Sequence, residues 1–134
     1  MFYEVTSKRT IQDAKGNDKE IAEKYLFENL EFFAEAEQKM YEFFNNENVV
    51  TAIKQSKILA FVNKRISDEQ AIYFATIENI IIDDSGAEKS SKYVVGLFAE
   101  SIEEANTIAN EYIKQEMIDS TLVGIKKTKI VDLL

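Results

Sequence analysis

The sequence predicts an α+β fold built as a tandem duplication, with one strand-strand-helix-strand unit in each half. One observation is a hexapeptide that occurs twice, as residues 53–58 (IKQSKI) and 125–130 (IKKTKI). A second is that each copy continues into an apolar tail, 59–62 and 131–134. Internal repeats decide a fold prediction before single elements do. We therefore expect six mostly antiparallel strands with two helices.

Further matches upstream of the hexapeptides support the duplication. Going backwards, the pairs are 33–36 with 102–105, 24–27 with 92–95, Gly16 with Gly86, and 3–6 with 73–76. Five matches in the same order predict a first half at 1–62, a linker at 63–71 and a second half at 72–134. The two halves are expected to form one compact domain, because each alone would bury too little apolar surface.

In the first half, residues 2–9 and 20–30 alternate in polarity, which is typical of strands, and they flank a polar loop around Gly16. A helix over 32–46 is predicted from apolar residues at helical spacing, namely Phe33, Ala36, Met40, Phe43 and Phe44. A strand over 49–58 closes the half.

In the second half we expect strands at 71–82 and 89–99 around the turn 83–86, whose Asp and Gly residues suit a hairpin. The isoleucines that end the first of these strands are expected to be buried on both faces: Ile77, Ile80, Ile81 and Ile82. Ser101 is expected to cap a helix with Glu104 reaching back, the reciprocal capping box. Residues 121–131 close the half.

The repeated closing strand has an irregular register. Ile53 and Ile58 are an odd number of residues apart, as are Ile125 and Ile130, so each pair would face opposite sides of a straight strand. Either both faces are covered there or each copy carries a bulge. The lysines of these segments are interpreted as protection of strand edges rather than as a basic binding patch: Lys54, Lys57, Lys126, Lys127 and Lys129.

These features together resemble an uncharacterised bacterial and phage family, a domain of unknown function of about this length with an internal duplication. The shared features are a short first strand, a charged hairpin, a helix start of the type Ser-Phe-x-Glu-Ala, and the closing Ile-Lys-x-Ser/Thr-Lys-Ile strand. Residues 101–105 (SIEEA) keep the helix start, whereas the first half has Phe32 in place of the serine. The resemblance implies a fold and no mechanism, because the family has no assigned catalytic residues.

The composition argues against an enzyme. The 134 residues include no His and no Cys, which removes an imidazole base, a Ser–His triad and the usual zinc ligands. The densest carboxylates, Asp83, Asp84 and Glu88, lack the spacing of an ion-binding loop. We expect no catalytic residue, no cofactor and no metal. With no signal peptide and no apolar run of membrane length, a cytoplasmic location is expected.

The net charge of −8 is concentrated in the second half, where residues 68–134 hold 6 basic and 13 acidic residues, against 10 and 11 in residues 1–67. Such a surface repels phosphate backbones, so direct binding of nucleic acid is disfavoured. It suits a basic protein partner, although acidity also serves solubility alone.

These observations predict an acidic protein-binding module, most plausibly a phage-encoded inhibitor of a bacterial defence nuclease of the anti-CRISPR type. It would engage the basic nucleic-acid-binding surface of a host nuclease or RNA-guided effector. No membrane partner is expected, and a homodimer is compatible with the sequence. The expected partner-binding residues are Tyr73, Glu78, Asp83, Asp84, Glu88, Tyr93, Glu100, Glu103, Glu104 and Glu111.

Two alternative functions are also compatible with the sequence. A housekeeping accessory protein could bind single-stranded nucleic acid through strand aromatics, which stack on bases, together with the Lys-bearing strands. The aromatics are Tyr3, Tyr25, Tyr73, Phe74 and Tyr93. The other alternative is a structural protein that self-assembles through exposed strand edges.

Overall fold

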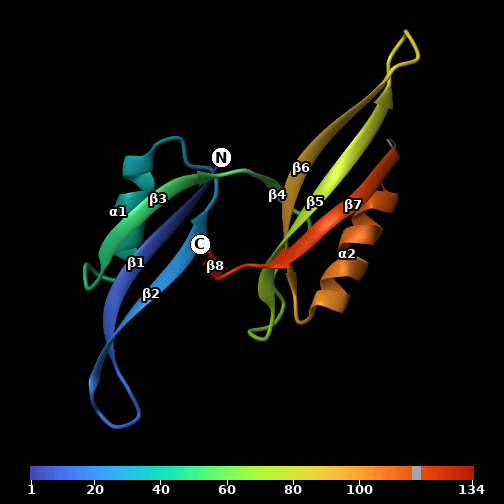
Figure 1. The fold of residues 1–134 in the computed structure, drawn as a ribbon. Helices are drawn as coiled ribbons and strands as arrows, with labels where there is room; N and C mark the ends of the chain where they lie inside the picture. The colour runs from blue at the N-terminus through green and yellow to red at the C-terminus, as the bar shows by residue number, and fades with distance from the viewer. Residues whose placement is uncertain (116–118) are drawn as a thin grey trace. The chain divides into compact units, whose positions relative to one another are not determined.

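The computed structural model of the chain describes residues 1–115 and 119–134. They form eight strands in two mixed four-stranded sheets and two helices (Figure 1). In chain order the elements are β1 (Phe2–Gln12), β2 (Asp18–Phe27), α1 (Phe33–Phe43), β3 (Val49–Ser56), β4 (Ile58–Phe61), β5 (Ala71–Ile82), β6 (Glu88–Ala99), α2 (Ile102–Lys114), β7 (Asp119–Lys127) and β8 (Ile130–Leu133).

The predicted α+β class is confirmed, but the prediction of six strands in a duplicated strand-strand-helix-strand unit is wrong. The chain forms two compact units, Met1–Ser56 with Lys129–Leu134 (unit 1) and Lys57–Thr128 (unit 2). Each unit contains a short parallel strand that the predicted repeat lacks, β8 in unit 1 and β4 in unit 2. Both short strands begin at the last isoleucine of a hexapeptide and continue into the apolar tail that follows it.

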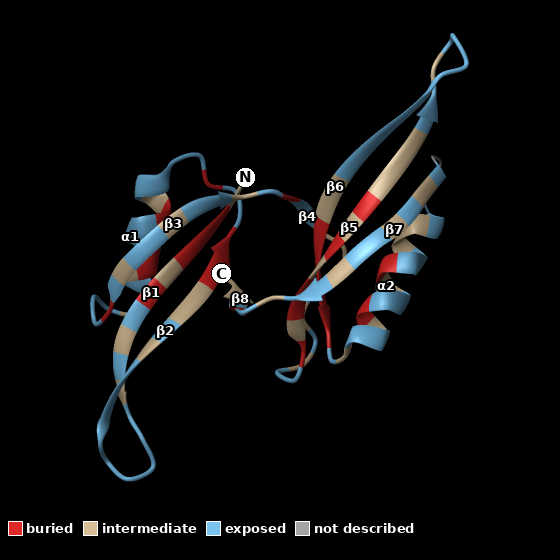
Figure 2. Ribbon diagram, in the orientation of Figure 1, coloured by how far each residue is buried: buried red, intermediate tan, exposed pale blue. Residues whose placement is uncertain are grey.

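Unit 1 is a sheet of order β3-β1-β2-β8 with α1 on one face. β1 pairs antiparallel with β2 from Tyr3↔Phe27 to Gln12↔Asp18. Residues of β1 and β2 that alternate toward the helix form the core with the buried residues of α1 (Figure 2), namely Tyr3, Val5, Tyr25, Phe27, Ala36 and Met40.

Unit 2 is a sheet of order β4-β6-β5-β7 with α2 on one face. β5 and β6 pair antiparallel over their full lengths, from Ala71↔Ala99 to Ile82↔Glu88. The core lies between these strands and the small buried residues of α2, and it contains Tyr73, Ala75, Ile77, Val95, Leu97, Ala105 and Ala109.

Chain length explains why β4 and β8 do not join the sheets that they follow. In unit 1 the open edge beside β2 lies three strand spacings from β3, about 14 Å. Only Lys57 separates β3 from β4, and the two peptide units from Ser56 to Ile58 span at most about 7 Å. In unit 2 the open edge beside β6 likewise lies about 14 Å from β7, and the three peptide units from Lys127 to Ile130 span at most about 11 Å. Each tail therefore pairs with the sheet of the other unit.

The same break explains the irregular register of the hexapeptides. Ile53 packs beside the unit 1 core, whereas Ile58 is buried in β4 and pairs with Val94 of unit 2. Ile125 and Ile130 are divided in the same way between β7 and β8. β3 and β7 also carry a bulge each, opposite Thr6/Ser7 of β1 and Thr76/Ile77 of β5. Both bulges come before Ile53 and Ile125 in the chain, so they do not separate the paired isoleucines.

The two long hairpins turn on an aspartate followed by a glycine. Asp13 accepts hydrogen bonds at Oδ1 from the backbone N–H groups of Lys15 and Asn17, at 2.9 and 3.0 Å. Asp83 accepts in the same way from Ser85 and Ala87. The third residue after each aspartate has φ near +80°, which only glycine adopts without strain. The predicted turn at 83–86 is confirmed.

The segment 63–71, expected to be a linker, is hydrogen-bonded into unit 2. Asn63 bonds with both backbone groups of Phe98: its side-chain nitrogen donates to the carbonyl at 2.9 Å, and its oxygen accepts from the N–H at 2.8 Å. The guanidinium of Arg65 donates to the carbonyl of Gln70 at 2.6 Å and lies over the ring of Phe98.

The helix starts differ as the sequence indicates. Ser101 accepts at Oγ from the N–H of Glu104, and the Glu104 carboxylate accepts from the N–H of Glu100, so the predicted reciprocal cap is confirmed with its second bond one residue before the cap. At the start of α1, Phe32 occupies the cap position and makes no side-chain bond there. Helix α1 also ends earlier than predicted, because Asn45 and Asn46 adopt positive φ.

Two predicted burial patterns are wrong. Phe33 and Phe43 of α1 are 52% and 50% exposed, and only Ala36 and Met40 of the helix are buried. In β5, Ile77 is buried, but Ile81 and Ile82, at the hairpin end of the strand, are 49% and 66% exposed. The end of β5 pairs with β6 up to the hairpin turn (Figure 1).

Candidate protein-interaction surfaces

The acidic residues predicted as one surface fall into two groups at opposite ends of unit 2. Asp83, Asp84 and Glu88 lie at the tip of the β5–β6 hairpin, whereas Glu100 and Glu103 lie where β6 ends and α2 begins. β6 has 12 residues, and at about 3.3 Å per residue its ends are about 36 Å apart. One partner site of ordinary size would not readily engage both groups.

Two of the predicted carboxylates on the β5–β6 hairpin, Asp83 and Glu78, have local partners. Asp83 accepts from Ser85 Oγ at 2.6 Å and lies 3.8 Å from Lys89 Nζ. The hydrogen bond from Ser85, followed by that from the Ala87 backbone, lowers the pKa of Asp83. Glu78 on β5 lies 3.8 Å from Lys92 Nζ on β6. Asp83 and Glu78 thus stabilise the hairpin in which they occur.

The aromatic anchors predicted beside the acidic residues are not exposed. Tyr73 is 4% exposed and belongs to the core of unit 2, and Tyr93 is half-buried against that core. Tyr3 and Tyr25 are buried in the same way in unit 1. A base could not stack on Tyr3, Tyr25 or Tyr73 without unfolding the sheet, so the structure removes three of the five aromatics of the nucleic-acid alternative.

The carboxylates of α2 differ in what they do. Glu104 caps the helix, whereas Glu103 and Glu111 are exposed. Within the described residues, no ion pair involves Glu103 or Glu111. Of the predicted residues, four have exposed carboxylates without a bond or ion pair among the described residues: Asp84 and Glu88 at the hairpin, and Glu103 and Glu111 on α2.

The lysines of the hexapeptides lie where edge protection requires them. β3 and β7 are the outer strands of their sheets, and they bear Lys54, Lys126 and Lys127. Lys54 Nζ lies 3.7 Å from Glu4, which is 8% exposed and is also 3.4 Å from Lys24 Nζ. Lys54, Lys126 and Lys127 thus lie on edge strands, and their role in protecting these edges stays a prediction.

A further surface, which the sequence did not indicate, lies along α1 in unit 1. A hollow of about 340 Å³ is lined by Phe27, Glu28, Lys39, Glu42, Phe43 and Leu134. We call it the α1 groove. It combines three apolar side chains with two carboxylates and one ammonium group. This mixture of an apolar floor and a few charged groups is typical of sites that recognise a ligand.

The position of Phe43 in the groove follows from helix geometry. Phe43 and Phe44 are neighbours on α1, and successive helical residues point about 100° apart, so both cannot face the sheet. Phe44 turns inward and is partly buried, and Phe43 remains 50% exposed. The ring of Phe43 is held against Phe44 at 4.8 Å and against Tyr25 at 5.5 Å, between ring centroids.

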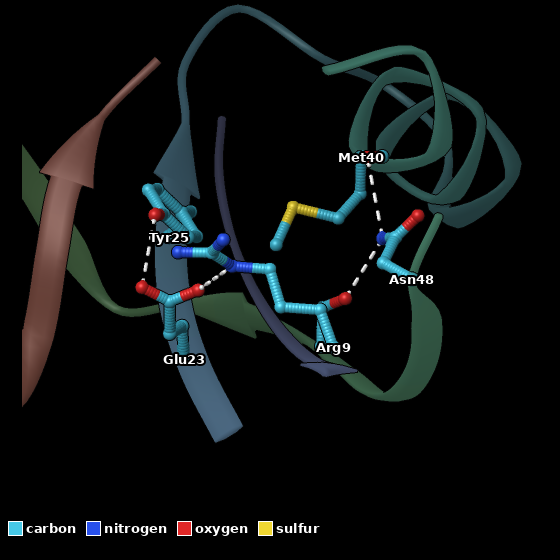
Figure 3. A network of polar contacts seen from close by, with 6 residues as sticks. Arg9, Glu23, Tyr25, Met40 and Asn48 are labelled. Atoms are coloured by element: carbon cyan, nitrogen blue, oxygen red, sulfur yellow. Dashed lines mark hydrogen bonds and ion pairs between the residues drawn. The ribbon is translucent and has the colours of Figure 1, made fainter. Parts of the chain in front are cut away.

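A polar network of Arg9 and Glu23 holds Tyr25 (Figure 3), whose ring contacts Phe43 of the groove. Arg9 Nε donates to Glu23 at 2.6 Å, and the guanidinium lies 5.1 Å from the centre of the Phe44 ring. The Tyr25 hydroxyl donates to the other oxygen of Glu23 at 3.4 Å. Burial, followed by the charge of Glu23, raises the pKa of Tyr25, and the bond to Glu23 raises the pKa of Arg9. Tyr25 therefore stays neutral and Arg9 charged at physiological pH.

A second part of Figure 3 joins α1 to β1 and β3. The Asn48 amide donates to Ser7 Oγ at 2.8 Å and to the carbonyl of Met40 at 3.4 Å. Asn48 is buried, and its Oδ1 has no hydrogen-bond partner. Tyr41 adds an acceptor for the N–H of Val50 at 3.2 Å. Because these bonds hold α1 to the strands, the groove is built on a fixed support.

The charge around α1 is as one-sided as that of the second half. Residues 28–47 contain six glutamates and one lysine, although residues 1–67 as a whole are nearly balanced. The acidic character of unit 1 is therefore concentrated on α1 and its flanking loops. Averaging over half the chain concealed it.

No described helix is long and apolar enough to cross a membrane. Among the residues that the structure describes, no three Asp or Glu side chains are grouped so as to hold a metal ion.

Comparison with known proteins identifies a family and nothing narrower. All 134 residues match the family described as Domain of unknown function (DUF4494), and the chain belongs to that family. The expected membership of an uncharacterised domain family is thereby confirmed. No curated protein and no solved structure gives a significant match.

Proposed function

We propose that the chain is a non-enzymatic module that binds a basic segment of another protein through the α1 groove. The observation that carries this proposal is the composition of the groove. Phe27, Phe43 and Leu134 offer an apolar surface, and Glu28 and Glu42 lie beside it. A partner segment with one large apolar side chain flanked by Lys or Arg fits these groups.

The roles within the groove follow from the side chains. The apolar residues take an aliphatic or aromatic anchor of the partner, since removal of such surface from water contributes about 25 cal/mol per Å². The glutamates attract its basic residues, which favours rapid association and selects against acidic segments. Lys39 can donate hydrogen bonds to backbone carbonyls of the bound segment.

The open shape also supports a protein rather than a small molecule as ligand. At about 340 Å³ the groove is at the lower end of the range for small-molecule sites, which usually enclose most of the ligand. An interface built around a single anchor in a shallow groove is typical of peptide recognition, where a few buried residues carry most of the affinity.

The narrower form of the proposal is inhibition of a bacterial defence nuclease by a phage-encoded protein. It rests on the charge of −8 and on the exposed Glu103 and Glu111 of α2, which could complement a basic nucleic-acid channel. Charge reversal at Glu103 and Glu111 should then abolish inhibition of an RNA-guided nuclease in a cleavage assay. Full inhibition by the reversed variant would contradict this form.

The test of the groove is selection of binding peptides from a random library displayed on phage, followed by fluorescence anisotropy with the selected peptides. We expect sequences with an apolar residue flanked by Lys or Arg. Phe43→Ser and Glu42→Lys should each weaken binding at least tenfold.

Matched controls are available on the same helix. Phe32→Ser removes a 63% exposed phenylalanine outside the groove, and Glu37→Lys reverses an exposed charge outside it. Both should leave affinity within about twofold. Equal losses from Phe43→Ser and Phe32→Ser, or selected peptides without basic residues, would overturn the proposal.

A further inference from the structure

The apolar tails behave as strands that must be received by a sheet other than the one that they follow. The connectors at Lys57 and at Thr128–Lys129 are too short for either tail to reach the open edge of its own sheet, as the distances above show. Within a single chain, the other unit receives each tail. Nothing in the connector lengths requires the receiving unit to belong to the same copy.

The acceptor for β8 is the edge of β2 in unit 1. β8 pairs with it in parallel through Lys24↔Ile130, Tyr25↔Asp132 and Leu26↔Leu133, with an irregularity after the first pair. The N–H of Leu134 donates to the carbonyl of Leu26 at 2.7 Å. Ile130 is 7% exposed, so the strand is seated by its apolar side chains as well as by its backbone.

β8 is joined to unit 2 through a well-defined hinge. The N–H and Oγ1 of Thr128 both donate to the carbonyl of Ile72, at 3.0 and 2.8 Å. Thr128 is therefore fixed in unit 2, and Lys129, which is exposed, is the single residue between this anchor and β8. A rotation of the backbone at Lys129 redirects β8 without disturbing β7.

β4 and the residues directly after it are held in unit 2 by contacts beyond strand pairing. The Phe61 ring stacks on Phe98 at 5.1 Å between centroids, and the N–H of Val62 donates to the carbonyl of Gly96. Directly after it, Asn63 bonds with both backbone groups of Phe98. Exchange of β4 would have to break these contacts as well as its strand pairing.

From these observations we propose that two copies of the chain exchange β8 reciprocally, so that β8 of each copy pairs with β2 of the other. The partner is a second copy because the acceptor edge already fits this segment. The pairing contacts are the same in the closed monomer and in the exchanged dimer, so the balance depends on protein concentration and on the hinge. Once formed, the dimer separates slowly, since β8 must leave its sheet first.

The absence of cysteine from the sequence allows a direct test by covalent trapping. A double variant, Lys24→Cys with Ile130→Cys, places thiols at paired positions of β2 and β8 and should form an internal disulfide in the monomer. Copies that carry Lys24→Cys alone and Ile130→Cys alone are then unfolded together, refolded at high concentration, oxidised and separated by size.

We expect a disulfide-linked dimer that contains one copy of each variant. Its yield should be at least tenfold above that of a control mixture of Lys24→Cys with Val123→Cys, whose thiol lies exposed on β7. If the double variant closes its internal disulfide but the mixture gives no more linked dimer than the control, the proposal is overturned.

If Ile130→Cys prevents folding, the wild-type chain decides the question. Isotopically labelled and unlabelled copies refolded together at millimolar concentration should give a dimer of mixed composition that persists for hours after hundredfold dilution. A chain that remains monomeric under these conditions, or a dimer that dissociates within seconds, overturns the exchange.

Discussion

Gly96 of β6 allows β4 to pack closely. Its replacement by alanine should lower the free energy of unfolding in the wild-type chain and raise it in a chain that lacks the Phe61 ring. A Cβ at this position would lie 2.8 Å from Cε1 and Cζ of Phe61, closer than side chains tolerate. The ring cannot withdraw freely, because it is stacked on Phe98. The backbone of Gly96 does not itself require glycine, since its φ is not positive.

Two opposing effects set the magnitude for Gly96→Ala. Alanine in a strand is favoured over glycine by about 0.5–1 kcal/mol, because a chain with alanine loses less conformational freedom when it folds. Displacement of a packed ring costs about 1–3 kcal/mol. The net expectation is a loss of about 1 kcal/mol in the free energy of unfolding.

A chain that lacks the Phe61 ring tests whether the clash with this ring causes the loss of stability. In a Phe61→Ala chain the clash is absent, so Gly96→Ala should stabilise the protein by about 0.5–1 kcal/mol. Urea unfolding followed by far-UV circular dichroism measures all four proteins of this double-mutant cycle. An equal loss in both backgrounds would refute the contact between Phe61 and Gly96 as the reason for glycine here.

Three further predictions concern the core, the helix caps and a turn. Met40→Ala removes a fully buried side chain of α1 and should lower the free energy of unfolding by about 2–5 kcal/mol in urea titrations, whereas Lys39→Ala beside it should change little. Phe32→Ser supplies the missing cap of α1, with Glu35 placed for the reciprocal bond, and should stabilise the protein by up to about 1 kcal/mol. Ser101→Ala removes the existing cap of α2 and should destabilise the protein by about the same amount. Thermal unfolding measures both effects. Because the pKa of Asp83 is lowered, its carboxylate stabilises the folded hairpin above the ordinary pKa of about 3.9, and this contribution is lost as the pH falls through the lowered value. Carbon NMR should therefore show the Asp83 carboxyl titrating below the ordinary pKa of an aspartate, and Asp83→Asn should flatten the acid limb of the stability curve. An ordinary titration of Asp83 would contradict its role in the turn.

Several local features were predictable because they depend on neighbouring residues. The Asp-x-x-Gly turns, the cap at Ser101 and the bounds of β5 all follow from short-range chemistry, and the structure confirms them. Burial was less predictable where it depends on what lies above a residue. Ile81 and Ile82 have the composition of a core strand but are exposed near the hairpin turn, and Phe43 competes with Phe44 for one inward position.

The candidate site was the least predictable part. The sequence directed attention to acidic residues of the second half, which the structure divides between two ends of unit 2. The α1 groove combines residues from β2, α1 and the end of the chain, and no spacing in the sequence relates Phe27, Phe43 and Leu134. A count of charge limited to residues 28–47, together with the adjacent phenylalanines, was the signal that could have drawn attention to it.

By itself, the sequence determined the α+β class, the paired hexapeptides with their apolar tails, and the break in strand register at Ile53–Ile58 and Ile125–Ile130. Only the tertiary structure decided where the tails go. Alternation of side chains shows that a segment is a strand, but not which sheet receives it. The receiving sheet is set by how far Lys57 and Thr128–Lys129 can reach against the width of a four-stranded sheet, and that width exists only once the sheets have formed.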